Sequence, residues 1–202
     1  MPSRPRQVRS RKTYNKLVEA AGLLVAEVGI ERTSSNAVAA KAGLTPPAFY
    51  RYFANKYEIL AELAHGLMEH QNTLLVALLE DVDDIHGSAQ IRARVGRLLS
   101  DTIDLTDQIS GGAAIMRSMR AIPQLEGIRL ESHSSMAAVM TDAAIARSPK
   151  LDRDTLYRQN RLAIEIGYAA IELAFDEPTL ARGPLVEDCA VAIESMHSGL
   201  FS

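Results

Sequence analysis

The amino-acid sequence predicts an all-α protein of 202 residues. From about residue 11 onward, apolar residues recur every three or four positions, which is the period of a helix with one buried face. No segment shows the apolar–polar alternation of a half-buried strand. Hydrophobic residues make up 47% of the chain but aromatic residues only 5%, so small aliphatic side chains that suit helices fill most of the core.

The first helix is expected at about residues 11–28, after an irregular start that contains Pro2 and Pro5. Gly29 is expected to end this helix, because glycine readily adopts the left-handed backbone that closes helices. The apolar face of the helix contains Leu17, Ala20, Ala21, Leu24 and Val28.

Two short helices joined by a tight turn are expected between residues 33 and 56. Thr33 or Ser34 is placed to cap the first of them, and Gly43 makes the turn. Thr45 is expected to cap the second, whose first turn holds two prolines where a missing N–H is harmless. The inward side chains are Val38, Ala39, Ala42, Leu44, Phe49 and Phe53, and the outward ones of the last helix are Tyr50, Arg51 and Tyr52. A turn of this kind between short helices holds a helix in the major groove of DNA.

The rest of the chain predicts further helices separated by glycine and proline breaks. They are expected at about residues 56–80, 88–109, 113–121, 124–147, 152–175 and 184–200. The breaks between them contain Gly87, Gly111, Gly112, Pro123, Pro149, Pro178, Gly183 and Pro184.

Charge is distributed unevenly along the chain, whose overall net charge is −3. Residues 1–57 hold ten Lys and Arg against three acidic residues, which gives +7. The remaining residues hold twelve basic and twenty-two acidic residues, which gives −10. This asymmetry indicates a polyanion-binding end, although a solvated basic tail would give the same count.

Several classes of protein are disfavoured by the composition. No apolar run reaches the roughly 18 residues that a membrane span requires, and no secretory signal follows the basic start. The single cysteine, Cys189, cannot form an internal disulfide and fits a reducing compartment. The sequence therefore predicts a cytoplasmic protein, and it contains no motif that calls for a cofactor.

The second-to-last helix carries two apolar stripes on different sides. One consists of Ile164, Tyr168, Ile171 and Phe175, and the other of Leu162, Ile166, Ala169 and Leu173. A helix that is apolar on two sides has to bury both. We therefore expect a homodimer in which the last two helices of each subunit form a four-helix bundle, although a larger monomer core would also bury both stripes.

These residues resemble the TetR (tetracycline-repressor-like) family of transcriptional regulators over about residues 11–62. The resemblance is carried by Gly29, Thr33, Val38, Ala39, the turn 42–45, Phe49, Tyr50, Tyr52, Phe53, Asn55, Lys56 and residues 58–60. It implies a helix-turn-helix DNA-binding domain at residues 1–57 and a helical ligand-binding and dimerisation domain at residues 58–202. It also implies a repressor, not an enzyme, that an effector releases from its operator.

The resemblance further implies which residues lie at the DNA. They are Arg9, Arg11, Asn36, Thr45, Pro46, Pro47, Ala48, Tyr50, Arg51, Tyr52 and Lys56, with Arg4 and Arg6 as further basic residues of the arm. Tyr50, Tyr52 and Lys56 would contact the phosphate backbone, Lys56 together with the N–H groups of its helix end. Arg51 would read guanine, whereas Ala48 would touch a thymine methyl and Asn36 would favour adenine.

Two prolines, Pro46 and Pro47, stand where family members often carry a polar or basic residue and a glycine. Because proline donates no hydrogen bond, this chain has few side chains for direct base recognition, and DNA shape is expected to contribute more.

The same resemblance implies an apolar effector pocket in the second region. Its candidate lining residues are Met68, Met116, Met119, Met140, Tyr168 and Phe175. Methionine suits such a pocket because its flexible side chain adapts to varied ligands, but each of these residues is equally suited to ordinary core packing.

Two other functions are compatible with parts of the sequence. The pairs Glu62/His65 and Glu194/His197 have the spacing that helical di-iron proteins use, but two further carboxylate ligands cannot be assigned. A nucleoid-type DNA binder without an effector is the other alternative, and it predicts DNA affinity that no small molecule changes.

Overall fold

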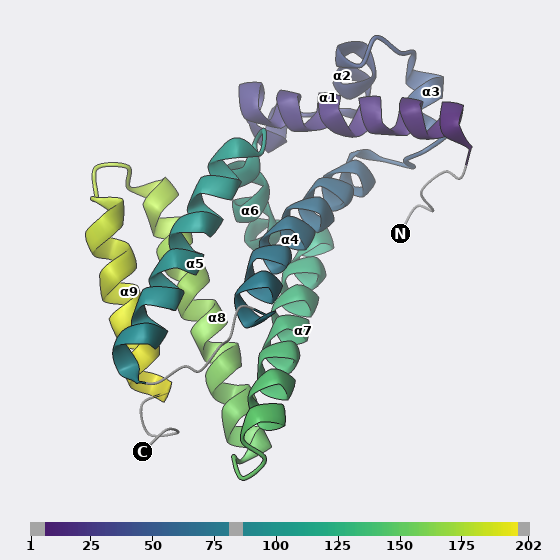
Figure 1. The fold of residues 1–202 in the computed structure, drawn as a ribbon. Helices are drawn as coiled ribbons and strands as arrows, with labels where there is room; N and C mark the ends of the chain where they lie inside the picture. The colour runs from purple at the N-terminus through teal and green to yellow at the C-terminus, as the bar shows by residue number, and fades with distance from the viewer. Residues whose placement is uncertain (1–6, 81–86, 198–202) are drawn as a thin grey trace. The chain divides into compact units, whose positions relative to one another are not determined.

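A computed structural model describes residues 7–80 and 87–197 and shows helices but no strand in these ranges (Figure 1). The all-α prediction is confirmed. In chain order the helices are α1 (Val8–Arg32), α2 (Ser35–Lys41), α3 (Pro46–Tyr50), α4 (Lys56–Glu80), α5 (Ser88–Gln108), α6 (Gly112–Ala121), α7 (Pro123–Arg147), α8 (Arg153–Asp176) and α9 (Arg182–His197).

The largest departure from the expected helix ends is in α1. Gly29 adopts the predicted left-handed backbone, with φ 78°, but it kinks the helix instead of ending it, and a further turn runs to Arg32. At the other end α1 begins at Val8, three residues before the expected start. α9 begins at Arg182, which places Pro184 in its first turn, where proline is tolerated. The expected end of α9 at residue 200 lies outside the described residues.

The chain packs as two compact units. Unit 1 comprises Met1–Glu69 and Thr106–Arg129, and unit 2 comprises His70–Leu105 and Leu130–Ser202. Packing thus assigns the first part of α4, all of α6 and the start of α7 to unit 1. These packing units do not test the functional division expected between residues 57 and 58, which stays a prediction.

In unit 1, α1 packs against α2 and α6, and α2 packs against α3 (Figure 1). Large side chains from α1, α3 and the start of α4 meet in its core. The buried cluster consists of Tyr14, Leu17, Ala20, Ala21, Leu24, Val38, Ala39, Phe49, Phe53 and Ile59. Burial of this apolar surface holds α2 and α3, each too short to be stable alone, on the long α1.

The turn between α2 and α3 is closed by a pair of backbone hydrogen bonds. Gly43 N donates to Ala40 O at 3.0 Å, and Leu44 N donates to Ala39 O at 2.9 Å. Gly43 has φ 67°, so this is the glycine-dependent C-terminal motif that satisfies the last carbonyls of a helix. The turn angle between α2 and α3 is therefore fixed by backbone geometry.

Replacing Gly43 with alanine should destabilise unit 1 by ~1 kcal/mol, since a non-glycine residue is strained at positive φ. No atom lies within 4 Å of a Cβ added there, so the loss comes from the backbone alone. Urea unfolding of Gly43→Ala measures it. Gly127→Ala is the control, because it adds a Cβ in equally open space within the helix α7, where alanine should be neutral or stabilising.

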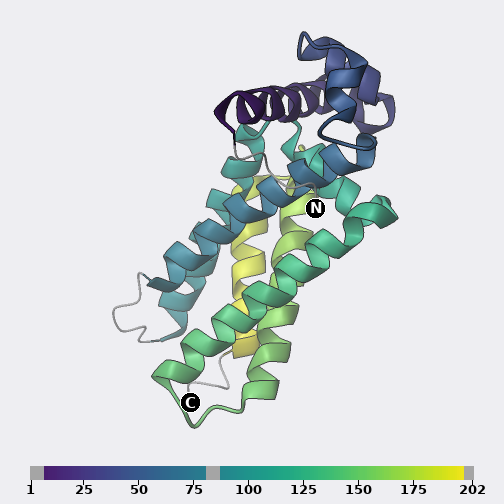
Figure 2. The same ribbon diagram turned by 90° about the vertical axis from the view of Figure 1, so that its right-hand side faces the viewer.

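In unit 2, α8 and α9 lie side by side (Figures 1 and 2). Gly167 of α8 allows a close approach of α5, because a Cβ there would lie 3.2 Å from the Leu99 side chain. Among the described residues, no helix combines the length and apolar character needed to cross a bilayer.

Candidate nucleic-acid interface and ligand cavity

The two phenylalanines of the α3 region set the direction of its outer side chains. Phe49 and Phe53 are four residues apart and fully buried, with their rings 5.5 Å apart. Tyr50 and Arg51 therefore project to the opposite side, where Tyr50 is 54% exposed and Arg51 is also exposed. This arrangement leaves a hydroxyl and a guanidinium free to approach a ligand outside the unit.

Most other residues predicted to lie at the DNA are accessible. Asn36, Thr45, Pro46 and Pro47 are exposed, and so are Arg9 and Arg11 near the start of α1, whereas Ala48 is half-buried. Arg4 and Arg6 lie outside the described residues.

Tyr52 does not project outward as predicted. It is half-buried, its ring packs edge-on against Tyr14 with centroids 6.1 Å apart, and its hydroxyl is 3.0 Å from the Ser10 Oγ. Because Tyr14 and Ser10 belong to α1, Tyr52 ties the residues after α3 to the first helix. Its position therefore supports the orientation of α3.

Capping of the short helices differs in part from the expectation. Ser34, rather than Thr33, caps α2 by accepting a hydrogen bond from Ala37 N at 3.2 Å. Thr33 instead donates from its hydroxyl to Gly29 O at 2.8 Å. Thr45 occupies the N-cap position of α3 without making a side-chain cap bond, so its hydroxyl is available for other partners.

The start of α4 is capped internally. Asn55 Oδ1 accepts from Tyr57 N at 2.8 Å and Glu58 N at 3.2 Å, while Glu58 accepts from Ala54 N at 2.7 Å. Two N–H groups at this helix end, Tyr57 N and Glu58 N, are therefore occupied within the chain, and the phosphate contact expected of Lys56 stays a prediction. Lys56 keeps its ammonium 5.5 Å from the centre of the Tyr57 ring.

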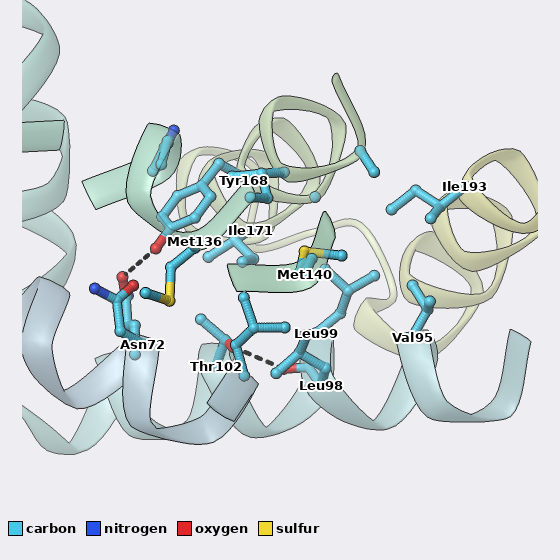
Figure 3. A pocket seen from close by; sticks show the side chains of 16 residues that line it. Asn72, Val95, Leu98, Leu99, Thr102, Met136, Met140, Tyr168, Ile171 and Ile193 are labelled. Atoms are coloured by element: carbon cyan, nitrogen blue, oxygen red, sulfur yellow. Dashed lines mark hydrogen bonds between the residues drawn. The ribbon is translucent and has the colours of Figure 1, made fainter. Parts of the chain in front are cut away.

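Unit 2 contains an apolar cavity of about 100 Å³ between α4, α5, α7, α8 and α9, called cavity 1 below. Figure 3 shows Tyr168 and Met136 toward one end and Val95 and Ile193 toward the other, with Met140 between them. The lining residues are Gln71, Asn72, Leu75, Val95, Leu98, Leu99, Thr102, His133, Met136, Met140, Ala163, Ile164, Gly167, Tyr168, Ile171 and Ile193.

Two of the six predicted lining residues, Met140 and Tyr168, line cavity 1. The other four do not. Met68, Met116 and Met119 are buried in unit 1, and Phe175 packs under the Arg182 guanidinium, 5.3 Å from its ring centre.

The polar end of cavity 1 is a connected network. The Tyr168 hydroxyl donates to Gln71 Oε1 at 2.7 Å, and the Tyr168 and His133 rings pack in a tilted arrangement with centroids 4.1 Å apart. His133 Nδ1 is 3.0 Å from Glu165 Oε1, which also accepts from Arg161 at 2.6 Å. Gln71, His133 and Glu165 did not stand out in the sequence, because each is a single polar residue within a helical pattern.

Burial and hydrogen bonding perturb two groups of this network. Burial opposes ionisation of Glu165, but hydrogen bonds from His133 and Arg161 outweigh it and lower the pKa of Glu165 to about 2. Burial, together with the negative charges of Glu165 and Glu172, raises the pKa of Tyr168. Glu165 is therefore a carboxylate at neutral pH, and Tyr168 keeps its proton.

Because the folded pKa of Glu165 is below its ordinary value of 4.5, Glu165 stabilises the fold above pH 4.5, and this contribution is lost as the pH falls toward 2. Glu165→Gln should lower the free energy of unfolding by about 1–2 kcal/mol at pH 7, after discounting for partial solvent screening. The difference from wild type should shrink as the pH falls through this window. Urea unfolding against pH measures it, with the exposed Glu131→Gln as the matched variant that should change neither quantity.

A second and larger cavity in unit 2, of about 580 Å³, adjoins the first. It shares the side chains of Val95, Met140 and Ile193 with cavity 1, so these three form a partition. Its other lining residues include Arg94, Arg147, Asn160 and His197.

Two of the four residues of the di-iron alternative are engaged in other interactions. Glu194 pairs with Arg92 at 3.5 Å, and both ring nitrogens of His197 face protein oxygens, Ile193 O at 2.9 Å and Asn160 Oδ1 at 3.2 Å. Glu62 and His65 belong to unit 1, whereas Glu194 and His197 belong to unit 2. Across the described ranges, no group of three or more His, Cys, Asp or Glu is arranged to hold a metal ion.

Comparison with known proteins gives a consistent result. Residues 17–63 match the family described as bacterial regulatory proteins, tetR family. An uncharacterized HTH-type transcriptional regulator, YvdT of Bacillus subtilis, is 25% identical over 95 residues. That alignment covers 47% of this chain and 46% of YvdT, so the chain spans about half the length of this relative.

Solved structures share the fold over nearly the whole chain. A tetR-family transcriptional regulator from Streptomyces coelicolor has a TM-score of 0.70 at 17% identity, covering 93% of this chain and 81% of its own. A complex of SmeT with triclosan has a TM-score of 0.65 at 21% identity and covers 90% of each chain. Residues 17–63, whose helices and glycine-closed turn are those described above, therefore match the tetR family of bacterial regulatory proteins, and the chain as a whole shares the fold of these solved structures.

Proposed function

We propose that this chain is a sequence-specific DNA-binding repressor, with no catalytic role, whose affinity for its operator falls when a small molecule binds in unit 2. The observation that carries the proposal is the exposed pair Tyr50 and Arg51 on a short helix fixed by a glycine-closed turn. Residues 1–57 serve as the DNA-binding region and residues 58–202 as the regulatory region.

Each residue expected at the DNA has a distinct role in this proposal. Arg51 pairs with guanine in the major groove, and Asn36 and Ala48 supply the other base-facing contacts. Tyr50, Thr45 and Lys56 contact phosphates, and Arg9 and Arg11 lie along the backbone or the minor groove. Pro46 and Pro47 lie against the DNA without donating, so shape contributes to recognition.

The direct test is selection of bound fragments from genomic DNA, followed by affinity measurements on the selected site. Lys56→Ala should weaken binding to all sequences and reduce the slope of log affinity against log salt by about 1. Arg51→Ala should instead relax preference by ~1–3 kcal/mol at one base pair. Lys150→Ala, at an exposed lysine of unit 2, is the control and should change neither property.

The proposal includes a homodimer formed through α8 and α9. The second apolar stripe of α8 remains accessible in the single chain, with Leu162 53% exposed, and Val191 of α9, the helix that packs against α8, is exposed as well. A dimer would bury these side chains and present two DNA-binding regions to two half-sites. Sedimentation at micromolar concentration should give a dimer mass, and Leu162→Glu should shift it toward the monomer.

Cavity 1 is the proposed effector site. Apart from its polar end, the lining is apolar and includes two flexible methionines, Met136 and Met140, which suits the binding of a small hydrophobic molecule. Triclosan bound to SmeT is a precedent for such a ligand within this fold. To regulate, the effector has to lower DNA affinity by at least ~1–3 kcal/mol of coupling.

A further inference from the structure

The hydrogen bond between Tyr168 and Gln71 presents a donor and an acceptor side by side at one end of cavity 1 (Figure 3). A ligand hydroxyl can accept from the Tyr168 hydroxyl and donate to Gln71 Oε1, so it can insert into this bond and satisfy both groups. A carbonyl can accept from Tyr168 but cannot donate to Gln71. The pair therefore matches a hydroxyl better than a ketone or an ester.

Charge in this part of unit 2 disfavours an anion. The negative charges of Glu165 and Glu172 are felt at Tyr168, where they oppose a second negative charge. Burial of a charged ligand in an apolar cavity is itself unfavourable. Arg161 and His133 already engage Glu165, so they are not free to neutralise an incoming carboxylate.

The volume of cavity 1 sets the size of the ligand. About 100 Å³ is less than the roughly 150 Å³ of an apolar cavity that holds benzene. A single ring therefore fits only with a small displacement of the lining, and Met140, the flexible member of the partition shared with the second cavity, is the side chain best able to move.

We propose that cavity 1 binds a neutral, mostly apolar molecule of the phenol class, that Tyr168 and Gln71 recognise its hydroxyl, and that Met140 limits the length of its apolar end. The inference rests on the effector role proposed above for cavity 1. It goes further by assigning a ligand class, two recognition residues and one residue that determines size.

Recognition of the hydroxyl is tested by calorimetric titration of the whole protein in the absence of DNA. The probes are p-cresol, toluene and 4-methylbenzoate, which are similar in size. p-Cresol should bind at least ~100-fold more tightly than 4-methylbenzoate, because burial of the carboxylate is unfavourable. Tyr168→Phe should weaken the binding of p-cresol by ~3–10-fold, the contribution of one hydrogen bond. It should leave the affinity for toluene within about twofold of the wild-type value. Tyr157→Phe, on the same helix outside the cavity lining, should change neither.

The partition is tested with 4-butylphenol. Met140→Ala should strengthen its binding by ~10-fold relative to p-cresol, because the added methylenes gain apolar burial beyond the partition. Met196→Ala, in α9 and outside the lining of both cavities, should not. Binding of 4-methylbenzoate as tight as p-cresol, or equal weakening of toluene and p-cresol by Tyr168→Phe, would overturn the ligand class. If phenols bind as expected but leave operator affinity unchanged, the regulatory proposal fails and the ligand assignment stands.

Discussion

Gly112→Ala is expected to destabilise unit 1 by roughly 3 kcal/mol or more, the upper range for an overpacked site. A Cβ at this position would lie 2.3 Å from Thr106 O and 3.2 Å from the Thr106 carbonyl carbon. These are backbone atoms at the end of α5, which cannot move aside as the tip of a flexible side chain can. Alanine therefore forces the start of α6 away from the last turn of α5.

Urea unfolding of Gly112→Ala gives the size of the loss, and Gly66→Ala is the matched control in unit 1. Gly66 lies within α4 with nothing inside 4 Å of an added Cβ, so alanine there should be neutral or stabilising. A loss below about 1 kcal/mol for Gly112→Ala would show that α6 shifts without resistance. Gly111 should be similarly intolerant, because it combines φ 75° with a Cβ position 2.9 Å from Val25 Cγ1.

The local features of the DNA-binding region could be predicted because their causes are local. The spacing of Phe49 and Phe53 fixes which side of α3 is buried, and Gly43 fixes the turn that precedes it. Tyr52 could not be placed in this way, since its hydroxyl partner Ser10 is 42 residues away in the chain. Helical periodicity gives the faces of a helix but not the partner that a half-buried side chain meets.

The cavity was predictable only in part, for a related reason. Periodicity marks Met116 and Met119 as inward-facing just as it marks Met140, but the first two fill the core of unit 1, whereas Met140 borders a void. A void exists where residues from several helices together fail to fill the space, so no single helix encodes it. The Gly111-Gly112 pair likewise looks like a simple loop in sequence, and only the packing around it shows why a side chain is excluded.

Phe49→Ala and Tyr50→Ala, at neighbouring positions of α3, should separate folding from DNA binding. Phe49 is fully buried and packs against Phe53, so truncation to alanine should destabilise unit 1 by about 3–5 kcal/mol through lost burial and a cavity. DNA affinity should fall as well, because the helix that presents Tyr50 and Arg51 loses its support.

Tyr50→Ala should instead leave unfolding within about 1 kcal/mol of wild type, since the side chain is 54% exposed. Its DNA affinity should nevertheless fall by ~10-fold for all sequences, the contribution of one phosphate contact. Urea unfolding and DNA titration of both variants measure the two quantities independently. Unchanged affinity for Tyr50→Ala would remove Tyr50 from the interface. If Tyr50→Ala instead unfolded the unit as readily as Phe49→Ala, the buried and exposed sides assigned to α3 would be wrong.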